Sequence, residues 1–280
     1  MRTILSLTLL FALLSAVAAE PQRFPGGAVH HAYGAATVTA NNARPMLVAV
    51  DALRQEYGWL LDYEDPPYQS PYELREGNSP TWRAAHPNGP PPWAPAGGEF
   101  SSTFAERPGL RAAATDDEKL QVLNKVVSDY NQSQNPGNFE VRRQSDGTYV
   151  ISGNAVRDDI GSKRAIPPIL DTTISIPIAT RTVKATIDLI AQTVLARTGI
   201  RIGIFSQSFA LGPGVTVTAG GDNTAARDLL IQTLKASNRP PSTRSWAWTL
   251  VYDPESSGYT LTFLLDQRFQ EGLPPPPDHK

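Results

Sequence analysis

Apolar residues recur at helical spacing in two segments of the first half of the chain. The first segment has them at intervals of four, three and four positions, at Met46, Val50, Leu53 and Tyr57. This spacing places them on one face of a helix, and Gly58 is positioned to end that helix in a left-handed conformation. The second segment follows residues 115–118, whose sequence Thr-Asp-Asp-Glu is typical of a capping box. The pattern therefore predicts two amphipathic helices in this half.

Short apolar and β-branched runs predict strands around these helices. Residues 37–39 precede the first helix, and residues 59–63 follow it. Residues 139–142 and 148–151 flank Ser-Asp-Gly at 145–147, which is typical of a hairpin turn because glycine tolerates a positive φ. The predicted order is strand, helix, strand, and then strand, helix, hairpin.

The second half shows the same order of patterns. One helical face, which Thr182 can cap and Gly199 can end, consists of Val183, Ile187, Ile190 and Val194. Another helix is predicted from about Asp222, with an apolar stripe at Leu229, Leu230 and Leu234. Strands are predicted at residues 174–176, 200–204, 215–218, 246–252 and 259–263. The chain therefore reads as one unit written twice.

Two hexapeptides support this duplication. Residues 104–109 and 209–214 both read Phe-Ala-x-x-Pro-Gly, and they start 105 positions apart. Gly58 and Gly199, which end the first helix of each copy, are 141 positions apart. The first copy therefore contains 36 additional residues between its first helix and its hexapeptide.

Most of this difference is a proline-rich insertion at residues 66–98, which has nine prolines and four glycines in 33 positions. Such a density predicts an extended backbone without a regular core element. The insertion carries four aromatic residues, Tyr68, Tyr72, Trp82 and Trp93. Held on a semi-rigid backbone, their rings could stack on sugars or dock into a groove. Alternatively, the loop wraps its own domain and buries them.

The expected fold class is α+β, with two tandem αβ sandwiches. The first occupies residues 36–152 and the second occupies residues 171–267, with a linker at 153–170. Residues 20–35 are expected to be a flexible lead segment, and residues 268–280 a proline-rich tail.

Residues 1–19 are typical of a secretory signal peptide. An arginine at position 2 precedes an apolar run of about a dozen residues, and small residues follow, so cleavage is expected after Ala18 or Ala19. No later segment is long and apolar enough to span a bilayer. The formal charge of −2 argues against nucleic-acid binding, and the absence of cysteine leaves stability to packed cores. A periplasmic or secreted location is therefore predicted.

The second half resembles the short N-terminal module of secretins and TonB-dependent proteins, known as STN. The residues that carry the resemblance are Ile-Pro-Ile at 176–178, Thr-Gly-Ile-Arg-Ile at 198–202, Val-Thr-Val-Thr-Ala-Gly-Gly at 215–221 and Ala-Arg-Asp-Leu-Leu at 226–230. The resemblance implies a small periplasmic αβ sandwich that engages other proteins and does not catalyse a reaction. Such modules usually precede a barrel or a secretin channel, and none follows Leu264 here. A role in signalling or secretion is therefore not implied.

Residues that could carry other chemistry are few. The four histidines, which are expected in the tails and the insertion and not in a metal site, are His30, His31, His86 and His279. Acidic residues cluster at 116–118, where the helix dipole explains them, and at 158–159 in the linker. No nucleophile elbow or phosphate loop is present, and no cofactor or metal is predicted.

Three functions are compatible with these patterns. The first is a non-enzymatic exported protein that binds or scaffolds another cell-envelope protein through its sheet edges or its insertion. The second is a glycan or peptidoglycan binder that stacks sugars on Tyr72, Trp82 and Trp93. The third is a hydrolase of unrecognised type that works through the carboxylates bordering the insertion, Asp62, Glu64 and Asp65.

Overall fold

The structure is a computed structural model of the chain. It describes residues 25–77, 83–84, 86–110, 114–205, 214–237 and 246–265. The predicted signal segment, the predicted tail with His279, Trp82 and nearly all of the second hexapeptide lie outside the described residues.

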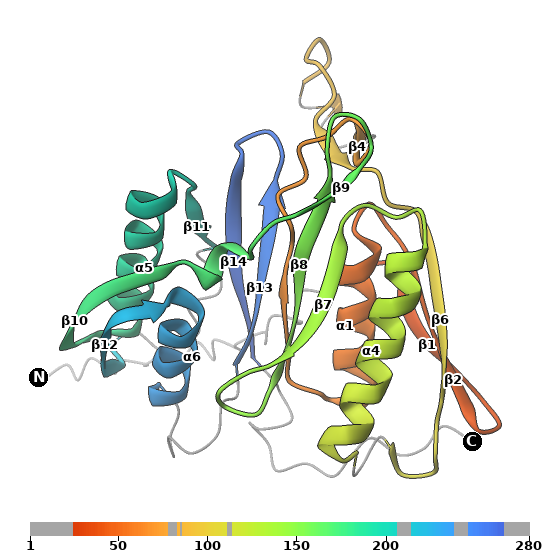
Figure 1. The fold of residues 1–280 in the computed structure, drawn as a ribbon, viewed down its shortest axis with the longest axis horizontal. Helices are drawn as coiled ribbons and strands as arrows, with labels where there is room; N and C mark the ends of the chain where they lie inside the picture. The colour runs from red at the N-terminus through yellow and green to blue at the C-terminus, as the bar shows by residue number, and fades with distance from the viewer. Residues whose placement is uncertain are drawn as a thin grey trace, which may run out of the picture.

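The first half has an outer sheet, two helices and a share of a central sheet (Figure 1). The outer antiparallel sheet consists of β1 (Gly27–Ala32), β2 (Ala35–Asn41) and β6 (Glu99–Ala105). The helices are α1 (Pro45–Tyr57) and α4 (Asp116–Gln132). The strands in the central sheet are β3 (Leu61–Glu64), β7 (Asn138–Arg143) and β8 (Tyr149–Arg157).

The second half repeats these layers with a smaller outer sheet. This sheet pairs only β10 (Thr173–Thr182) with β12 (Thr216–Ala225). The helices are α5 (Val183–Thr198) and α6 (Ala226–Ala236). The strands in the central sheet are β11 (Ile202–Ile204), β13 (Trp246–Asp253) and β14 (Gly258–Leu265).

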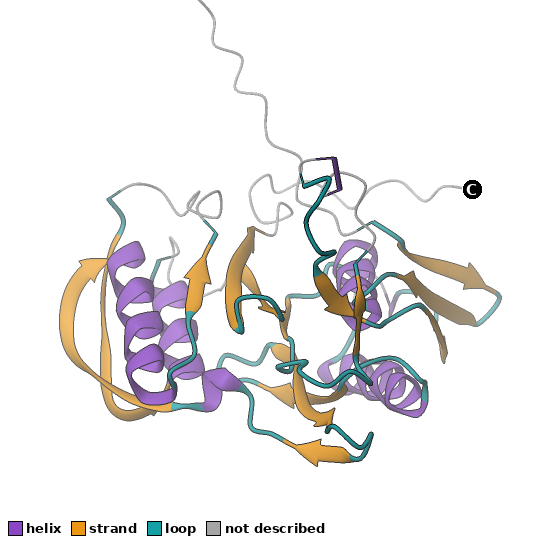
Figure 2. Cartoon of the chain, turned by 90° about the horizontal axis from the view of Figure 1, so that it is seen from above, coloured by secondary structure: helices purple, strands orange, loops and turns teal. Residues whose placement is uncertain are grey.

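The two halves share one central sheet. Its strand order is β11-β14-β13-β3-β8-β7, and the short strand β9 (Lys163–Ala165) pairs with β8. The halves meet where β13 runs parallel to β3. Helices α5 and α6 cover one face of this sheet and α1 and α4 cover the other, as Figures 1 and 2 show from two directions. The molecule therefore has five layers, with the shared sheet in the middle.

Side chains of the central strands alternate between two hydrophobic cores. Val150 lies in the core beneath α5 and α6, whereas its neighbours Tyr149 and Ile151 lie in the core beneath α1 and α4. A strand that is buried on both faces reads as a continuous apolar run, which explains the sequence Tyr-Val-Ile at the start of β8.

The central strands of the two halves pair in the same way. In the first half β3 is parallel to β8, and β8 is antiparallel to β7. In the second half β11 is parallel to β14, and β14 is antiparallel to β13. Leu61 opposes Tyr149 and Ile202 opposes Tyr259, so Tyr149 and Tyr259 hold corresponding places. The reversed strand directions place the helices of the two halves on opposite faces.

The α+β class is confirmed, as are the predicted ends of α1 and α5 and the predicted start of α4. Gly58 and Gly199 cap α1 and α5 in the left-handed conformation, with φ of 63° and 72°. Thr115 and Glu118 form the predicted capping box of α4. Helix α6, however, starts at Ala226 and not near Asp222, because residues 222–225 continue β12 against β10.

Three segments that were expected to be irregular contain strands. The lead segment 20–35 includes β1, which forms a hairpin with β2 because Gly34, with a φ of 74°, permits a tight turn. The linker 153–170 contains the end of β8 and all of β9, and a short 3-10 helix, η1 (Ile169–Asp171), follows at its end. The insertion contains β4 (Leu74–Glu76) and β5 (Trp93–Pro95), which pair as a two-stranded ribbon.

Candidate functional site

The base of the insertion is built into the core of the molecule, and its Tyr68 belongs to the core beneath α5 and α6. Pro66 lies directly on β8, where a Cβ on Gly153 would be 2.4 Å from the proline ring. Tyr68 is only 1% exposed, and its hydroxyl donates to Asp65 over 3.2 Å. Burial raises the pKa of Tyr68 well above that of a free tyrosine, so the phenol stays protonated and acts as a donor. Tyr68 is therefore a core residue and cannot serve as a stacking platform.

Further contacts hold the two ends of the insertion against the body. Buried Glu73 accepts from the Gly137 amide through its carboxylate over 2.8 Å, and its carbonyl accepts from the Ala96 amide over 2.7 Å. Burial raises the pKa of Glu73. The Ser70 hydroxyl donates to the Asp158 carbonyl over 2.8 Å. The ribbon formed by β4 and β5 thus starts and ends at fixed points.

Two aromatic residues in or next to this ribbon face solvent. Tyr72 is 54% exposed and Trp93 is 51% exposed. Tyr72 lies against the loop between β8 and β9, because a Cβ on Gly161 would be 3.4 Å from its ring. The neighbouring Ile160 is 79% exposed. We refer to these three exposed residues, Tyr72, Trp93 and Ile160, as the aromatic surface; they lie just before β4, on β5 and in the loop before β9, and Figure 1 shows β4 and β9 at one end of the molecule.

The sequence predicted the same role for all four aromatic residues of the insertion, whereas in the structure their exposure differs. Tyr72 and Trp93 are accessible, Tyr68 is buried, and Trp82 lies outside the described residues. Ile160 was not predicted. Its signal was weak, since a single apolar residue in a loop after two aspartates has no periodicity. Asp158, one of those aspartates, accepts from the Ile160 and Ser162 amides and shapes this loop.

The three carboxylates that border the insertion are buried and bonded to other elements. Asp62 accepts from the Trp248 amide over 2.9 Å and from the Gln144 amide group. Glu64 accepts from the Leu170 amide over 3.2 Å and from the Arg227 guanidinium over 2.9 Å. These acids therefore bond β3 to the strands and helices around it.

Asp65 also has several hydrogen-bond partners. It accepts from the Arg44 guanidinium over 2.9 Å, from the Tyr63 hydroxyl over 2.5 Å and from the Tyr252 amide over 3.1 Å. Burial raises the pKa of Asp65 and of Glu64, although the facing guanidinium groups oppose that rise. A general acid or base needs access to a substrate atom, whereas these side chains face strands of the same chain.

The buried charges continue from Glu64 across the junction of the halves. Arg227 on α6 bonds both Glu64 on β3 and Asp171 in η1, each over 2.9 Å. Arg142 on β7 pairs with Asp171 as well. Burial alone would raise the pKa of Asp171, but these two guanidinium groups lower it below its usual value. Arg227 thus holds parts of both halves together.

His31 lies in β1, where a flexible tail was expected. Its Nδ1 is 2.7 Å from Glu106 and its Nε2 is 3.0 Å from Glu56. The hydrogen bond with Glu106 raises the pKa of His31. Among the residues that the structure describes, no group of three or more histidine, cysteine or acidic side chains is arranged to hold a metal ion.

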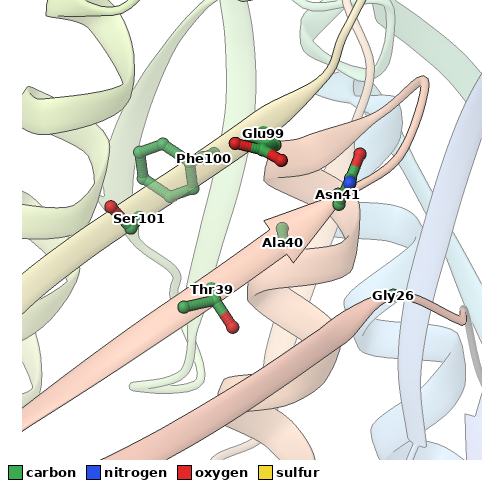
Figure 3. Close-up of a pocket in the computed structure, with 7 residues that line it drawn as sticks. All are labelled: Gly26, Thr39, Ala40, Asn41, Glu99, Phe100 and Ser101. Atoms are coloured by element: carbon green, nitrogen blue, oxygen red, sulfur yellow. The ribbon is translucent and has the colours of Figure 1, made fainter.

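An open hollow of about 350 Å³ lies on the first outer sheet, at the ends of β2 and β6 (Figure 3). Its lining residues are Gly26, Thr39, Ala40, Asn41, Glu99, Phe100 and Ser101. Figure 3 shows the side chains of Asn41 and Glu99 next to each other at the strand ends. One carboxylate with short polar neighbours offers little to fix a ligand, so the aromatic surface is the stronger candidate site.

No helix within the described part of the chain is long and apolar enough to cross a membrane. Comparisons with protein-family models, with curated proteins and with solved structures found no match.

Proposed function

We propose that the protein is an exported, non-enzymatic binding module, and that another cell-envelope protein docks on its aromatic surface. The observation that carries this proposal is the contrast within the insertion. Its base at Pro66, Tyr68 and Glu73 lies in the core, whereas Tyr72 and Trp93 are half exposed. Aromatic residues on a fixed backbone lose little conformational freedom on binding, which favours affinity.

The outer edge of β10 is a less suitable docking site. A partner strand needs a continuous row of free amides and carbonyls. Pro177 in β10 has no amide hydrogen, and the pairing with β12 shifts register on either side of Ile176. The Arg181 guanidinium also donates to the Pro177 carbonyl over 3.0 Å. These features favour the insertion over this sheet edge.

The test is a quantitative pull-down from envelope extract with the mature protein as bait. We expect at least one envelope protein to be retained by the wild type and to fall about tenfold or more with Tyr72→Ser/Trp93→Ser, since buried aromatic contacts contribute about 2 kcal/mol each. Tyr33→Ser is the matched control, because Tyr33 is fully exposed in the turn between β1 and β2. Equal recovery by all three baits contradicts the proposal.

Glycan binding is the second candidate, and the same exposed rings favour it. Sugar rings stack on accessible aromatic faces, and Trp93 would report their binding through its fluorescence. Titration with peptidoglycan fragments should change the emission of the wild type but not that of Trp93→Ser if this candidate holds. An unchanged wild-type spectrum removes it and leaves the protein partner.

A further inference from the structure

The junction between the halves depends on bonds to the outer edge of β13. Thr249 pairs with Tyr63 and Leu250 pairs with Glu64, in parallel register. Just before these pairs, the Trp248 amide donates to the Asp62 carboxylate over 2.9 Å. Strand β3 thus supplies both a backbone edge and an acidic anchor to β13.

The central strands pair in the same way in both halves. The two strands that form the junction, β13 and β3, therefore have counterparts at the two ends of the central sheet. Arg143 opposes Tyr149 as Tyr252 opposes Tyr259, so β7 corresponds to β13. Four residues earlier in each strand, Phe139 corresponds to Trp248. Strand β11 corresponds to β3 in the same way. The edge of β7 and the edge of β11 therefore correspond to the two sides of the junction, and within the described residues neither edge pairs with another strand.

At both ends of the central sheet, the positions that correspond to the junction have different residues or contacts from those in the junction itself. The Phe139 amide donates to the Asn131 side-chain carbonyl over 2.9 Å, and the Asn131 amide group donates to the Phe139 carbonyl over 2.8 Å. The side chain of Asn131, which comes from α4, thus occupies the donor and the acceptor that a neighbouring strand would use. At Phe139, Asn131 takes the two places that the Asp62 carboxylate and the Arg54 guanidinium take at the Trp248 amide and carbonyl.

On β11 the acidic anchors are replaced. Gly203 stands where β3 has Asp62, and Phe205 stands where β3 has Glu64. Phe205 is 38% exposed. Among the described residues, the atom nearest to a Cβ at position 203 would be the Tyr259 carbonyl oxygen, at 3.6 Å, so these residues leave room for a side chain there. The absence of an acid therefore does not follow from a lack of space.

We infer that the two ends of the central sheet are complementary, that the edge of β7 fits the edge of β11 in a second copy of this chain, and that Asn131 and Gly203 prevent this pairing. Repeat arrays in general need terminal units that stop propagation. A contact in which different surfaces of two copies meet does not close on itself, so without these two residues the chain would assemble head to tail.

The experiment is sedimentation velocity on the mature chain over a range of concentrations. The wild type is expected to be monomeric, and Asn131→Ala/Gly203→Asp is expected to form concentration-dependent oligomers with a mean mass of roughly twice the monomer or more. A wild type that already assembles, or a folded double variant that stays monomeric, overturns the inference.

Two controls identify the contact. Asn135→Ala removes a similar cap, since Asn135 bonds the Gly98 amide and the Glu99 carbonyl at the start of β6. This variant should stay monomeric because β6 lies in the outer sheet and takes no part in the junction of the halves. Asn131→Ala/Gly203→Lys should also stay monomeric, because lysine cannot accept from the Phe139 amide. Oligomers in either control contradict the assigned pairing. If the alanine variants fail to fold by circular dichroism, Asn131→Ser/Gly203→Asp is measured with the same expectation.

Discussion

Strands β8 and β14 hold corresponding places in the two halves, yet at one of these places the two residues differ greatly in size. Phe139 opposes Gly153 on β8, and Trp248 opposes Phe263 on β14, so a glycine in the first half stands where the second half has a buried phenylalanine. Pro66 lies on Gly153. The base of the insertion thus occupies space that a core side chain fills in the other half.

This difference shows that the insertion is not a loop added to a finished domain. Its first residues replace part of the core, and Tyr72 and Trp93 farther along it reach solvent. Deleting residues 66–98 would therefore damage the fold and the docking surface together. Point variants that perturb one contact in one half are more informative. Their expected effects on stability are largest at the junction of the halves and smallest at strand β1.

The largest effect is expected at the junction that joins the halves. Arg227→Ala leaves Glu64 buried without its guanidinium partner, which should lower the free energy of unfolding by about 3–5 kcal/mol. Chemical denaturation measures this change. The control is Arg143→Ala, which removes an exposed pair with Asp116 and should cost about 1 kcal/mol or less. Similar losses in both variants would show that the buried network does not hold the halves together.

The second effect concerns the docking of the insertion on β8. Gly153→Ala places a methyl group where Pro66 lies, and such overpacking should cost about 1–3 kcal/mol. Gly203→Ala in the second half meets only an ordinary contact at 3.6 Å and should be nearly neutral. If Gly153→Ala is also neutral in thermal unfolding, the insertion is not seated on β8.

The third effect compares helix caps across the halves. Thr115 caps α4 by accepting from the Glu118 amide, and Thr182 caps α5 by accepting from the Ala185 amide. Replacing either threonine by alanine should cost about 1 kcal/mol. Thr115→Ala should cost the more of the two, because the reciprocal bond from its backbone amide to Glu118 also depends on the cap geometry. A larger loss for Thr182→Ala in urea unfolding would reverse this ranking.

The smallest effect is a pH dependence at β1, a strand without a counterpart in the described part of the second half. The raised pKa of His31 means that its bonds to Glu106 and Glu56 stabilise the fold fully below the usual pKa of about 6.5. The contribution is lost as the pH rises through the higher folded value. At pH 5.5 the wild type should have a free energy of unfolding that is roughly a few tenths of a kcal/mol higher than that of His31→Gln. This difference should vanish in alkaline buffer. A difference that grows with pH contradicts this assignment.

Local features of the fold could be predicted from the sequence because their causes lie within a few residues. The helical faces, the glycines that end α1 and α5, and the capping box at Thr115 are of this kind. The hairpin of β1 and β2 was missed because its turn, Tyr33-Gly34, lies in a segment with little apolar content.

Features of the candidate site that depend on distant partners could not be predicted. Tyr68 and Tyr72 lie four positions apart in one proline-rich segment, and only the first is buried against the core. Glu64 is part of an acidic cluster in the sequence, and its partner Arg227 is 163 residues away. Nothing near either residue indicates that they meet.

Site-specific photo-crosslinking in envelope extract, with a benzophenone amino acid at one position at a time, tests whether the insertion carries partner binding. This segment is the main difference between the halves, so the two halves should differ in what they capture. We expect the same crosslinked envelope protein from positions 72 and 93, and none from position 178, where Ile178 is exposed on β10 of the second half. A partner captured at position 178 and absent at positions 72 and 93 would contradict the proposed docking surface.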